Sequence, residues 1–261
     1  MKKTRKIICN KKVDLAKNSC KVFFKIGRKM DFSEVFNIKK TDIISIIGSG
    51  GKTSLMNKLA KDLRKKGRVL ITTSTKIKRP KDYEADFIYD SFEDFRIGNK
   101  KNFIIALGKL IKEVGKFSAV KEEDLLKIKN NFDYLLIEAD GARNLPMKMW
   151  KDTEPVIYGS TSKVILVFSA KLIGEKISKD FIYNYKAFRE EIKEELVNEK
   201  VYLKLIKKLV LEEYGVDKFV YFNQAEGREE ETKKIITYLK AHTQGIKYVQ
   251  GSVLKEEIYE N

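Results

Sequence analysis

Short apolar runs alternate along this chain with longer segments in which apolar positions recur at helical spacing. The apolar runs carry few charges, as is typical of strands buried on both faces of a sheet. We expect strands at residues 43–47, 68–73, 86–89, 102–107, 134–137, 163–168, 218–222 and 246–249. We expect helices at residues 52–63, 122–130 and 229–239, a mostly helical segment at residues 181–211, and a short helix beginning near residue 31. This order predicts an α/β fold, with a mostly parallel sheet and flanking helices.

The first expected strand leads into the sequence G-S-G-G-K-T-S at residues 48–54. A strand, a glycine-rich loop and a helix that opens with Lys-Thr form the arrangement of phosphate-binding loops. The loop amides would face a phosphate, and the helix dipole favours negative charge there. Lys52 is expected to reach the β- and γ-phosphates, and the Thr53 hydroxyl to ligate Mg²⁺. The candidate binding residues are Gly48, Ser49, Gly50, Gly51, Lys52, Thr53 and Ser54.

This loop departs from the common pattern, which has a glycine five residues before Gly51, where this chain has Ile46. The shorter form G-x-x-G-K-T-S resembles the loop of the Mur ligases as much as that of GTPases. The alternative is a plain glycine turn followed by an incidental Lys-Thr. Because strand and helix both flank the loop, we predict a P-loop NTPase-like domain over residues 30–261.

A second signal is the sequence D-Y-L-L-I-E-A-D-G at residues 133–141. Glu138 and Asp140 end an apolar strand with one residue between them, so both project from the same side. A carboxylate after a buried strand is what phosphate-loop proteins use to hold Mg²⁺, directly or through water. We predict Lys52, Glu138 and Asp140 as catalytic residues and Thr53, Glu138 and Asp140 as the metal site. The alternative is an acidic strand end that is merely solvated.

Polar residues near these two signals leave further roles open. Hydroxyls in T-T-S-T-K at residues 72–76 either meet Mg²⁺ or the γ-phosphate, or cap the next turn. Arg143, Lys148 and Lys151 follow the carboxylates closely in sequence. They either pair with substrate phosphates and neutralise transition-state charge, or are ordinary surface cations.

The strand expected at residues 218–222 runs into the sequence N-Q-A-E at residues 223–226. This resembles the N-K-x-D element with which GTPases read guanine. We therefore predict that Asn223, Gln224 and Glu226 contribute to nucleotide binding. Gln224 stands where that element has lysine, and Glu226 is one methylene longer than aspartate, so the choice between ATP and GTP stays open. The alternative is a polar loop after a strand.

The net charge of +17 is concentrated at the N-terminus. Residues 1–40 hold thirteen Lys or Arg against three Asp or Glu, and the remaining residues carry a net charge of only +7. We expect residues 1–29 to be a basic extension: an arm for a partner, a poorly ordered lead-in, or a segment upstream of a start at Met30. An apolar cluster at residues 22–26 leaves open an edge strand. Without a recognition motif, a nucleic-acid role is disfavoured.

The two cysteines, Cys9 and Cys20, and the single histidine, His242, do not have the spacing of a Zn site. The sequence has no apolar run of transmembrane length and no secretory signal. We therefore expect a cytoplasmic protein with no membrane association.

Several motifs occur together in an order that resembles the YqeC family. They are G-S-G-G-K-T-S, T-T-S-T-K-I, E-A-D-G-A-R-N-L-P-M-K followed by D-T-E-P, and F-N-Q-A-E. The resemblance covers roughly residues 30–252, and the block from E-A-D-G-A to E-P is its most specific part. It implies an accessory role in the maturation of selenium-dependent molybdenum hydroxylases, with such an enzyme or its cofactor as partner.

The motifs and the resemblance lead to one main hypothesis and two alternatives. The main hypothesis is an NTPase that binds ATP or GTP with Mg²⁺ and serves cofactor maturation. The first alternative is an ATP-dependent ligase or kinase of Mur-like chemistry that acts on a small molecule. The second is a nucleotide-bound scaffold that does not hydrolyse its ligand.

Overall fold

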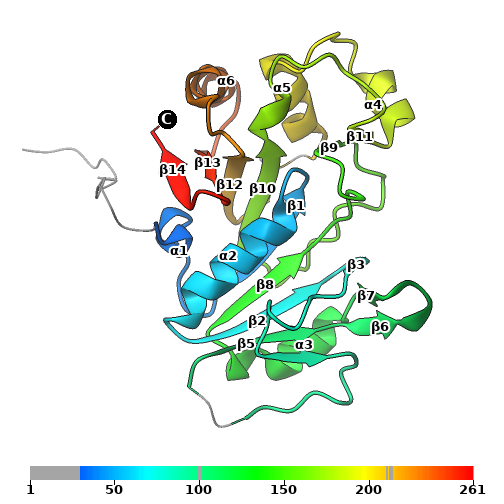
Figure 1. The fold of residues 1–261 in the computed structure, drawn as a ribbon, viewed down its shortest axis with the longest axis vertical. Helices are drawn as coiled ribbons and strands as arrows, with labels where there is room; N and C mark the ends of the chain where they lie inside the picture. Colours follow the sequence, from blue (N-terminus) through cyan, green and yellow to red (C-terminus); the bar gives the residue numbers. More distant parts are fainter. Residues whose placement is uncertain (1–29, 99–100, 210, 212–213, 261) are drawn as a thin grey trace, which may run out of the picture.

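The computed structural model describes residues 30–98, 101–209, 211 and 214–260 (Figure 1). Its centre is a nine-stranded sheet with the strand order β14-β13-β12-β10-β1-β8-β2-β5-β4. Neighbouring strands in this sheet run parallel, except β13 and β14, which are antiparallel. The predicted α/β fold with a mostly parallel sheet is therefore confirmed, and the arrangement is compatible with a P-loop NTPase-like fold.

All the strands expected from the apolar runs are present. They are β1 (Ile43–Gly48), β2 (Arg68–Thr73), β4 (Phe87–Tyr89), β5 (Phe103–Leu107), β8 (Tyr134–Glu138), β10 (Lys163–Ser169), β12 (Asp217–Asn223) and β13 (Ile246–Ser252). The sequence does not predict the edge strand β14 (Glu257–Tyr259), because its two apolar residues stand among charged neighbours in K-E-E-I-Y-E.

Helices cover both faces of the sheet. The α-helices are α1 (Phe32–Val35), α2 (Lys52–Arg64), α3 (Glu122–Ile128), α4 (Tyr185–Glu191), α5 (Glu199–Lys208) and α6 (Glu229–His242), and the 3-10 turns are η1 (Lys112–Val114), η2 (Lys129–Asn131) and η3 (Ala170–Leu172). Ile44 and Ile46 of β1 share a core with α1 and α2. Ile43 and Ile47 belong to the cores on the opposite face, which include residues of α3, α5 and α6. Side chains alternate along a strand, so both faces of β1 are buried and Ser45 is its one polar residue.

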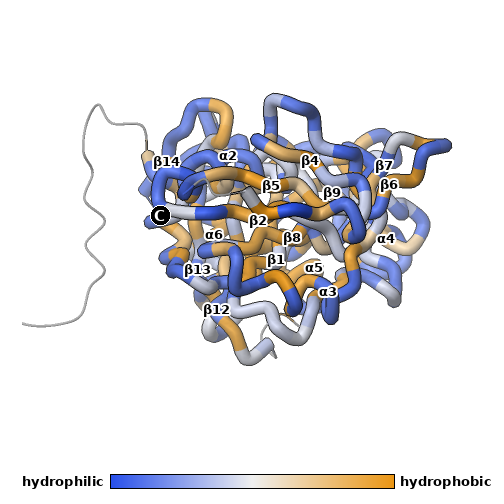
Figure 2. Tube along the Cα trace, turned by 90° about the horizontal axis from the view of Figure 1, so that it is seen from below, coloured by the Kyte–Doolittle hydropathy of each residue, from blue (hydrophilic) through white to orange (hydrophobic). Residues whose placement is uncertain are grey.

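The hydrophobic residues follow this layering. Figure 2 shows apolar segments along β1, β2, β5 and β8 in the middle of the molecule, with hydrophilic stretches on the outer connections. Every residue of β1, β5, β8 and β10 is buried. The sheet therefore forms the rigid middle layer that positions the loops at its edge.

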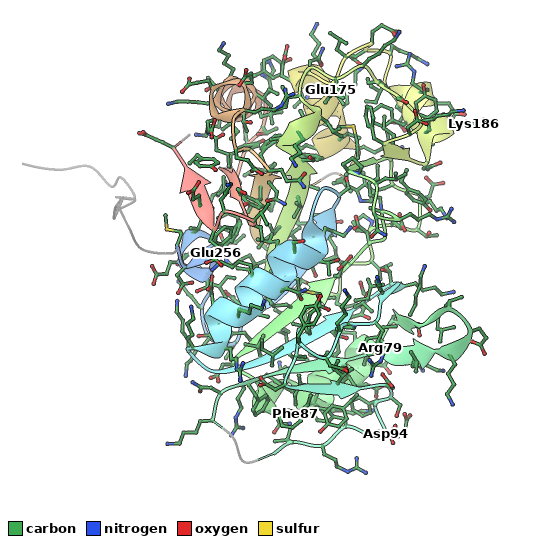
Figure 3. All side chains as sticks on the ribbon, viewed as in Figure 1. Arg79, Phe87, Asp94, Glu175, Lys186 and Glu256 are labelled. Carbon is green, nitrogen blue, oxygen red and sulfur yellow. The ribbon has the colours of Figure 1, made fainter. Side chains whose placement is uncertain are left out.

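The helix α2 also holds the N-terminal part of the described chain against the sheet. Asp62 of α2 is buried and accepts the backbone N–H of Phe32 at 3.0 Å and the Lys58 ammonium at 2.9 Å. Lys58 also lies 3.4 Å from Glu256, which is labelled near α1 in Figure 3. Residues from both ends of the described chain thus meet on α2.

Two small sheets lie outside the main one. β3 (Ile77–Lys78), β7 (Lys116–Ser118) and β6 (Lys109–Ile111) form an antiparallel sheet in that order. β9 (Met147–Lys148) and β11 (Ile182–Tyr183) form a parallel pair. The second pair fixes the chain that follows Asp140, and it therefore bears on the site described below.

Residues 181–211, expected to be mostly helical, contain two helices separated by extended backbone. This segment contains β11, then α4, then an irregular stretch, then α5. Asn184 adopts a left-handed conformation before α4, and Ile192 is extended and buried after it. Asn198 then caps α5, because its side chain accepts the N–H groups of Lys200 and Val201. Buried apolar residues occur in both helical and extended parts of the segment, so their spacing does not reveal the interruption.

The expectations about residues 1–29 and about a cytoplasmic location remain predictions. Residues 1–29, including the apolar cluster at residues 22–26, lie outside the described residues. Within the described residues, no helix has both the length and the apolar character needed to cross a membrane.

Candidate functional site

The glycine-rich loop lies at the carboxyl end of β1, in the middle of the sheet. β1 pairs with β8 on one side and with β10 on the other. The loop is folded back against β10, because Ser49 N–H donates to Val167 O at 3.0 Å. Gly50 has a φ of +84°, and a Cβ there would lie 2.6 Å from the backbone nitrogen of Ser169. Glycine is required at this position both by the conformation and by the close approach.

The start of α2 faces this loop. The helix begins at Lys52 with Gly51 as its N-cap, and no side chain among the described residues caps it. Helix N-termini carry N–H groups without intrahelical partners and the positive end of the helix dipole. The Ser49 hydroxyl is also buried and lacks a hydrogen-bond partner within the described residues. These polar groups suit an anion with several acceptor oxygens, such as a triphosphate.

Lys52 is buried at the centre of an ionic cluster. Its ammonium donates to Gly48 O at 2.7 Å and lies 3.0 Å from Asp140 Oδ1 and 3.8 Å from Glu138 Oε1. Burial disfavours the charged ammonium, but the carboxylates of Asp140 and Glu138 outweigh burial and raise the pKa of Lys52. The lysine is therefore charged, and it lies between the loop and both predicted carboxylates.

Glu138 contacts Thr53, the residue predicted to ligate Mg²⁺. The Thr53 hydroxyl donates to Glu138 Oε2 at 2.8 Å. Burial raises the pKa of the Glu138 carboxyl, and the Lys52 ammonium and the Thr53 hydroxyl oppose this shift without cancelling it. A second cation near Glu138 would favour its ionised form.

These oxygens fit a Mg²⁺ ion shared with a nucleotide. Mg²⁺ in nucleotide sites is held by one or two protein oxygens, phosphate oxygens and water. The described residues hold no group of three or more acidic, His or Cys side chains that would form a metal cage by themselves. A hydroxyl and one carboxylate beside a phosphate-binding loop match the shared kind of site.

Asp140 forms hydrogen bonds and ion pairs with several neighbouring residues. Its Oδ2 accepts the backbone N–H of Gly48 at 2.8 Å and the Trp150 indole N–H at 2.6 Å. Lys148 Nζ lies 3.5 Å from the same oxygen. The Lys148 ammonium also donates to Gly141 O, and it donates to Glu154 Oε2 at 2.8 Å. Both carboxylates turn toward the loop, but only Glu138 touches Thr53. Glu138 is therefore the better placed of the two for the metal, and Asp140 for orienting Lys52.

Three of the four hydroxyls of T-T-S-T-K donate to backbone oxygens of other segments. Thr72, Thr73 and Ser74 donate to the backbone oxygens of Leu107, Glu138 and Val156. They join β2 to the neighbouring connections, and Thr73 also accepts the N–H of Thr75 at 3.0 Å, which is the turn-capping alternative. The Thr75 hydroxyl is buried and has no hydrogen-bond partner within the described residues.

The N-Q-A-E segment lies at the same edge of the sheet as the loop. The Asn223 amide donates to Gly50 O at 2.9 Å and its oxygen accepts the N–H of Val253 at 3.0 Å. Gln224 accepts the Ser169 hydroxyl at 2.6 Å. Asn223 and Gln224 thus hold the loop and its surroundings in place, and any direct contact with a nucleotide stays a prediction.

Glu226 differs from those two residues because part of its carboxylate has no partner. Its Oε2 is buried without a hydrogen bond to the described residues. Burial and the nearby Glu226 charge raise the pKa of Tyr221 well above its usual value. A buried acceptor of this kind suits a ligand with N–H donors.

Sequence reasoning missed two structural partners of the site. Trp150 and Ser169 hold Asp140 and Gln224, respectively, through single hydrogen bonds between distant residues. The sequence suggests Lys148 only as a substrate-binding or surface cation, whereas its side chain is fully buried and ion-paired. A lysine inside the apolar sequence L-P-M-K-M-W is a signal for a buried ion pair.

Comparison with known proteins gives one family and one relative. The family model described as "YqeC protein" matches residues 44–186. The protein of Escherichia coli (strain K12) called "Uncharacterized protein YqeC" is 33% identical over 158 residues. That alignment covers 58% of this chain and 61% of the relative, which is less than two thirds of the relative's length. The segment that the family model matches includes the glycine-rich loop, Glu138 and Asp140.

The buried ion pairs of Lys148 lead to a prediction about stability. Lys148→Met leaves Glu154 and part of Asp140 without a cation, and breaking a buried pair in this way costs about 3–5 kcal/mol. The free energy of unfolding, measured by urea denaturation, should fall by that amount. Lys151→Met is the control, because Lys151 is exposed and should change stability by less than about 0.5 kcal/mol. Equal stability of the two variants would contradict the prediction.

Proposed function

The chain belongs to the YqeC family, and we propose that it binds a purine nucleoside triphosphate with Mg²⁺ and hydrolyses it. One observation carries the proposal: Lys52, Thr53 and Glu138 converge on the glycine-rich loop at the centre of the sheet. This geometry supports phosphoryl chemistry, in which catalysis consists mainly of positioning and charge neutralisation.

Each residue of the cluster has a role that follows from its contacts. Lys52 holds a positive charge at the mouth of the loop and would bind the β- and γ-phosphates. Thr53 and Glu138 would hold Mg²⁺, which supplies further positive charge to the phosphate oxygens. Asp140 ties the Gly48 amide and the Lys52 ammonium together, so that the loop keeps its shape when Lys52 engages the phosphates.

The resemblance to the YqeC family supports a biological setting for this reaction. We propose that nucleotide turnover serves the maturation of selenium-dependent molybdenum hydroxylases, acting on such an enzyme or on its cofactor. Product analysis tests the reaction type. Release of free phosphate without an acceptor supports an NTPase, dependence on an acceptor supports a ligase or kinase, and Mg²⁺-dependent binding without turnover supports a scaffold.

The role of Lys52 predicts a selective loss of nucleotide binding in Lys52→Ala. Loss of a charged hydrogen bond costs about 1.5–3 kcal/mol, which corresponds to about 10- to 150-fold in affinity. The variant also loses the buried ion pairs of Lys52, which should lower its stability by about 3–5 kcal/mol. We expect it to stay folded, because Asp140 keeps the Gly48, Trp150 and Lys148 donors. Calorimetric titration with Mg²⁺ and a non-hydrolysable triphosphate measures the loss.

Lys61→Ala is the matched control for Lys52→Ala, because Lys61 is an exposed lysine of the same helix. It should bind the nucleotide as the wild-type chain does. A folded Lys52→Ala protein that retains wild-type affinity would remove the phosphate-binding assignment of the loop.

The buried, unpartnered oxygen of Glu226 generates a prediction about the base. A carboxylate there would accept the N–H groups of guanine, which adenine does not offer at the same positions. Glu226→Ala should therefore weaken GTP binding by about tenfold or more and leave ATP binding nearly unchanged. Glu230→Ala, which removes an exposed carboxylate nearby, should change neither affinity. Equal losses of ATP and GTP binding by Glu226→Ala would show that the segment is structural.

A further inference from the structure

We propose that Arg143, Lys151 and Tyr183 form the binding site for a second substrate, a small molecule that carries a phosphate or carboxylate group. The proposal rests on the proposed nucleotide function, because it places this molecule beside the nucleotide site. Three observations support it: a group of cations around one aromatic ring, the lack of carboxylate partners for two of them within the described residues, and their connection to Asp140.

Three cationic groups surround the ring of Tyr183. The Arg143 guanidinium carbon lies 5.4 Å from the ring centroid, and the ammonium nitrogens of Lys148 and Lys151 lie 5.7 Å and 6.0 Å from it. Contacts of this length are favourable individually. Lys148 has its own carboxylate partners, so the repulsion that remains is between Arg143 and Lys151. An anion at this place would relieve that repulsion.

The three cations differ in whether they are already neutralised. Lys148 is buried and pairs with Glu154 and Asp140. Arg143 and Lys151 are exposed, and neither forms an ion pair with a carboxylate in the part of the chain that the structure describes. Two of the three charges are therefore free to bind an oxyanion from solvent.

The backbone holds this group in a defined position. Arg143 and Asn144 both adopt left-handed backbone conformations, with φ angles of 49° and 62°. Leu145 N–H closes the turn by donating to Ala142 O at 2.9 Å. Non-glycine residues in this conformation cost free energy and persist where the surrounding structure determines them. The turn presents Arg143 to the side of the ring.

The site is connected to the nucleotide cluster through Lys148. In the parallel pair of β9 and β11, Tyr183 lies opposite Lys148, which itself contacts Asp140. Figure 1 shows β9 and β11 on the same side of the molecule as the start of α2. An oxyanion held by Arg143 and Lys151 would therefore lie next to the cluster that binds the triphosphate. This is where an NTPase that acts on a small molecule must hold its second substrate.

The chemistry of the site defines what it binds. Arg and Lys donate to phosphate and carboxylate oxygens, and Arg does so with a planar pair of N–H groups. The Tyr183 ring adds an apolar surface beside the charges. Phosphate and carboxylate groups share this recognition chemistry, so the test includes both.

The test uses Trp150, the only tryptophan of the chain, as a fluorescent reporter. Its ring lies 5.6 Å from Lys148 Nζ, next to the proposed site. The full chain, saturated with Mg²⁺ and a non-hydrolysable triphosphate, is titrated with inorganic phosphate or with acetate at constant ionic strength. The nucleotide affinity of each protein is measured in a separate titration.

The variant Arg143→Gln/Lys151→Gln removes both free charges. It should bind the preferred anion about tenfold more weakly than the wild-type chain, with unchanged nucleotide affinity. The control Lys234→Gln/Lys240→Gln removes the same charge from exposed positions of α6 and should bind the anion as the wild-type chain does. Saturation by phosphate alone or by acetate alone identifies the group that the substrate carries.

Two results would overturn the second-substrate site. One is a wild-type chain that shows no saturable response to either anion. The other is equal anion binding by the two double variants. Failure of the proposed function is a different result, because it appears in the separate titration as an absence of nucleotide binding by the wild-type chain.

Discussion

The buried ion pair between Lys52 and Asp140 connects the parts of this structure on which its chemistry depends. Lys52 opens α2, Asp140 follows β8, and the two charged groups lie 3.0 Å apart in a region closed to solvent. Buried charges are costly unless they are paired and hydrogen-bonded. Here the Gly48 amide, the Gly48 carbonyl and the Trp150 indole complete the pair. Separating the two charges would leave each of them buried without a partner, which is costly. The pair therefore fixes the loop, the helix and the strand end relative to one another.

The parallel sheet explains why these groups meet. The carboxyl ends of β1, β8, β10 and β12 lie at one edge, so the loops that follow them are neighbours even though they are far apart in sequence. The glycine-rich loop follows β1, the carboxylates follow β8, Ser169 ends β10 and Asn223 ends β12. The cations around Tyr183 extend the same edge through Lys148. The site is thus a consequence of topology, with the side chains supplying charge and donors.

Local sequence signals predict the centre of this site, and contacts between distant residues complete it. The apolar run before Gly48 and the run before Glu138 predict two buried strands, and parallel pairing then places Lys52, Thr53 and Glu138 together. No local pattern indicates that Trp150 donates to Asp140 or that Asn223 donates to Gly50, because these bonds depend on how loops pack. The interruption between α4 and α5 has the same origin: buried residues occur in helical and extended parts of this segment alike, so periodicity alone does not reveal it.

A crystal structure of the full chain with Mg²⁺ and a non-hydrolysable purine triphosphate tests the central claim most directly. The account predicts phosphate oxygens against the amides of residues 48–54, with Lys52 on the β- and γ-phosphates and Thr53 and Glu138 beside Mg²⁺. Asp140 should keep its bonds to Gly48 and Trp150. A triphosphate bound elsewhere, with Lys52 still enclosed by Asp140 and Glu138, would contradict the account.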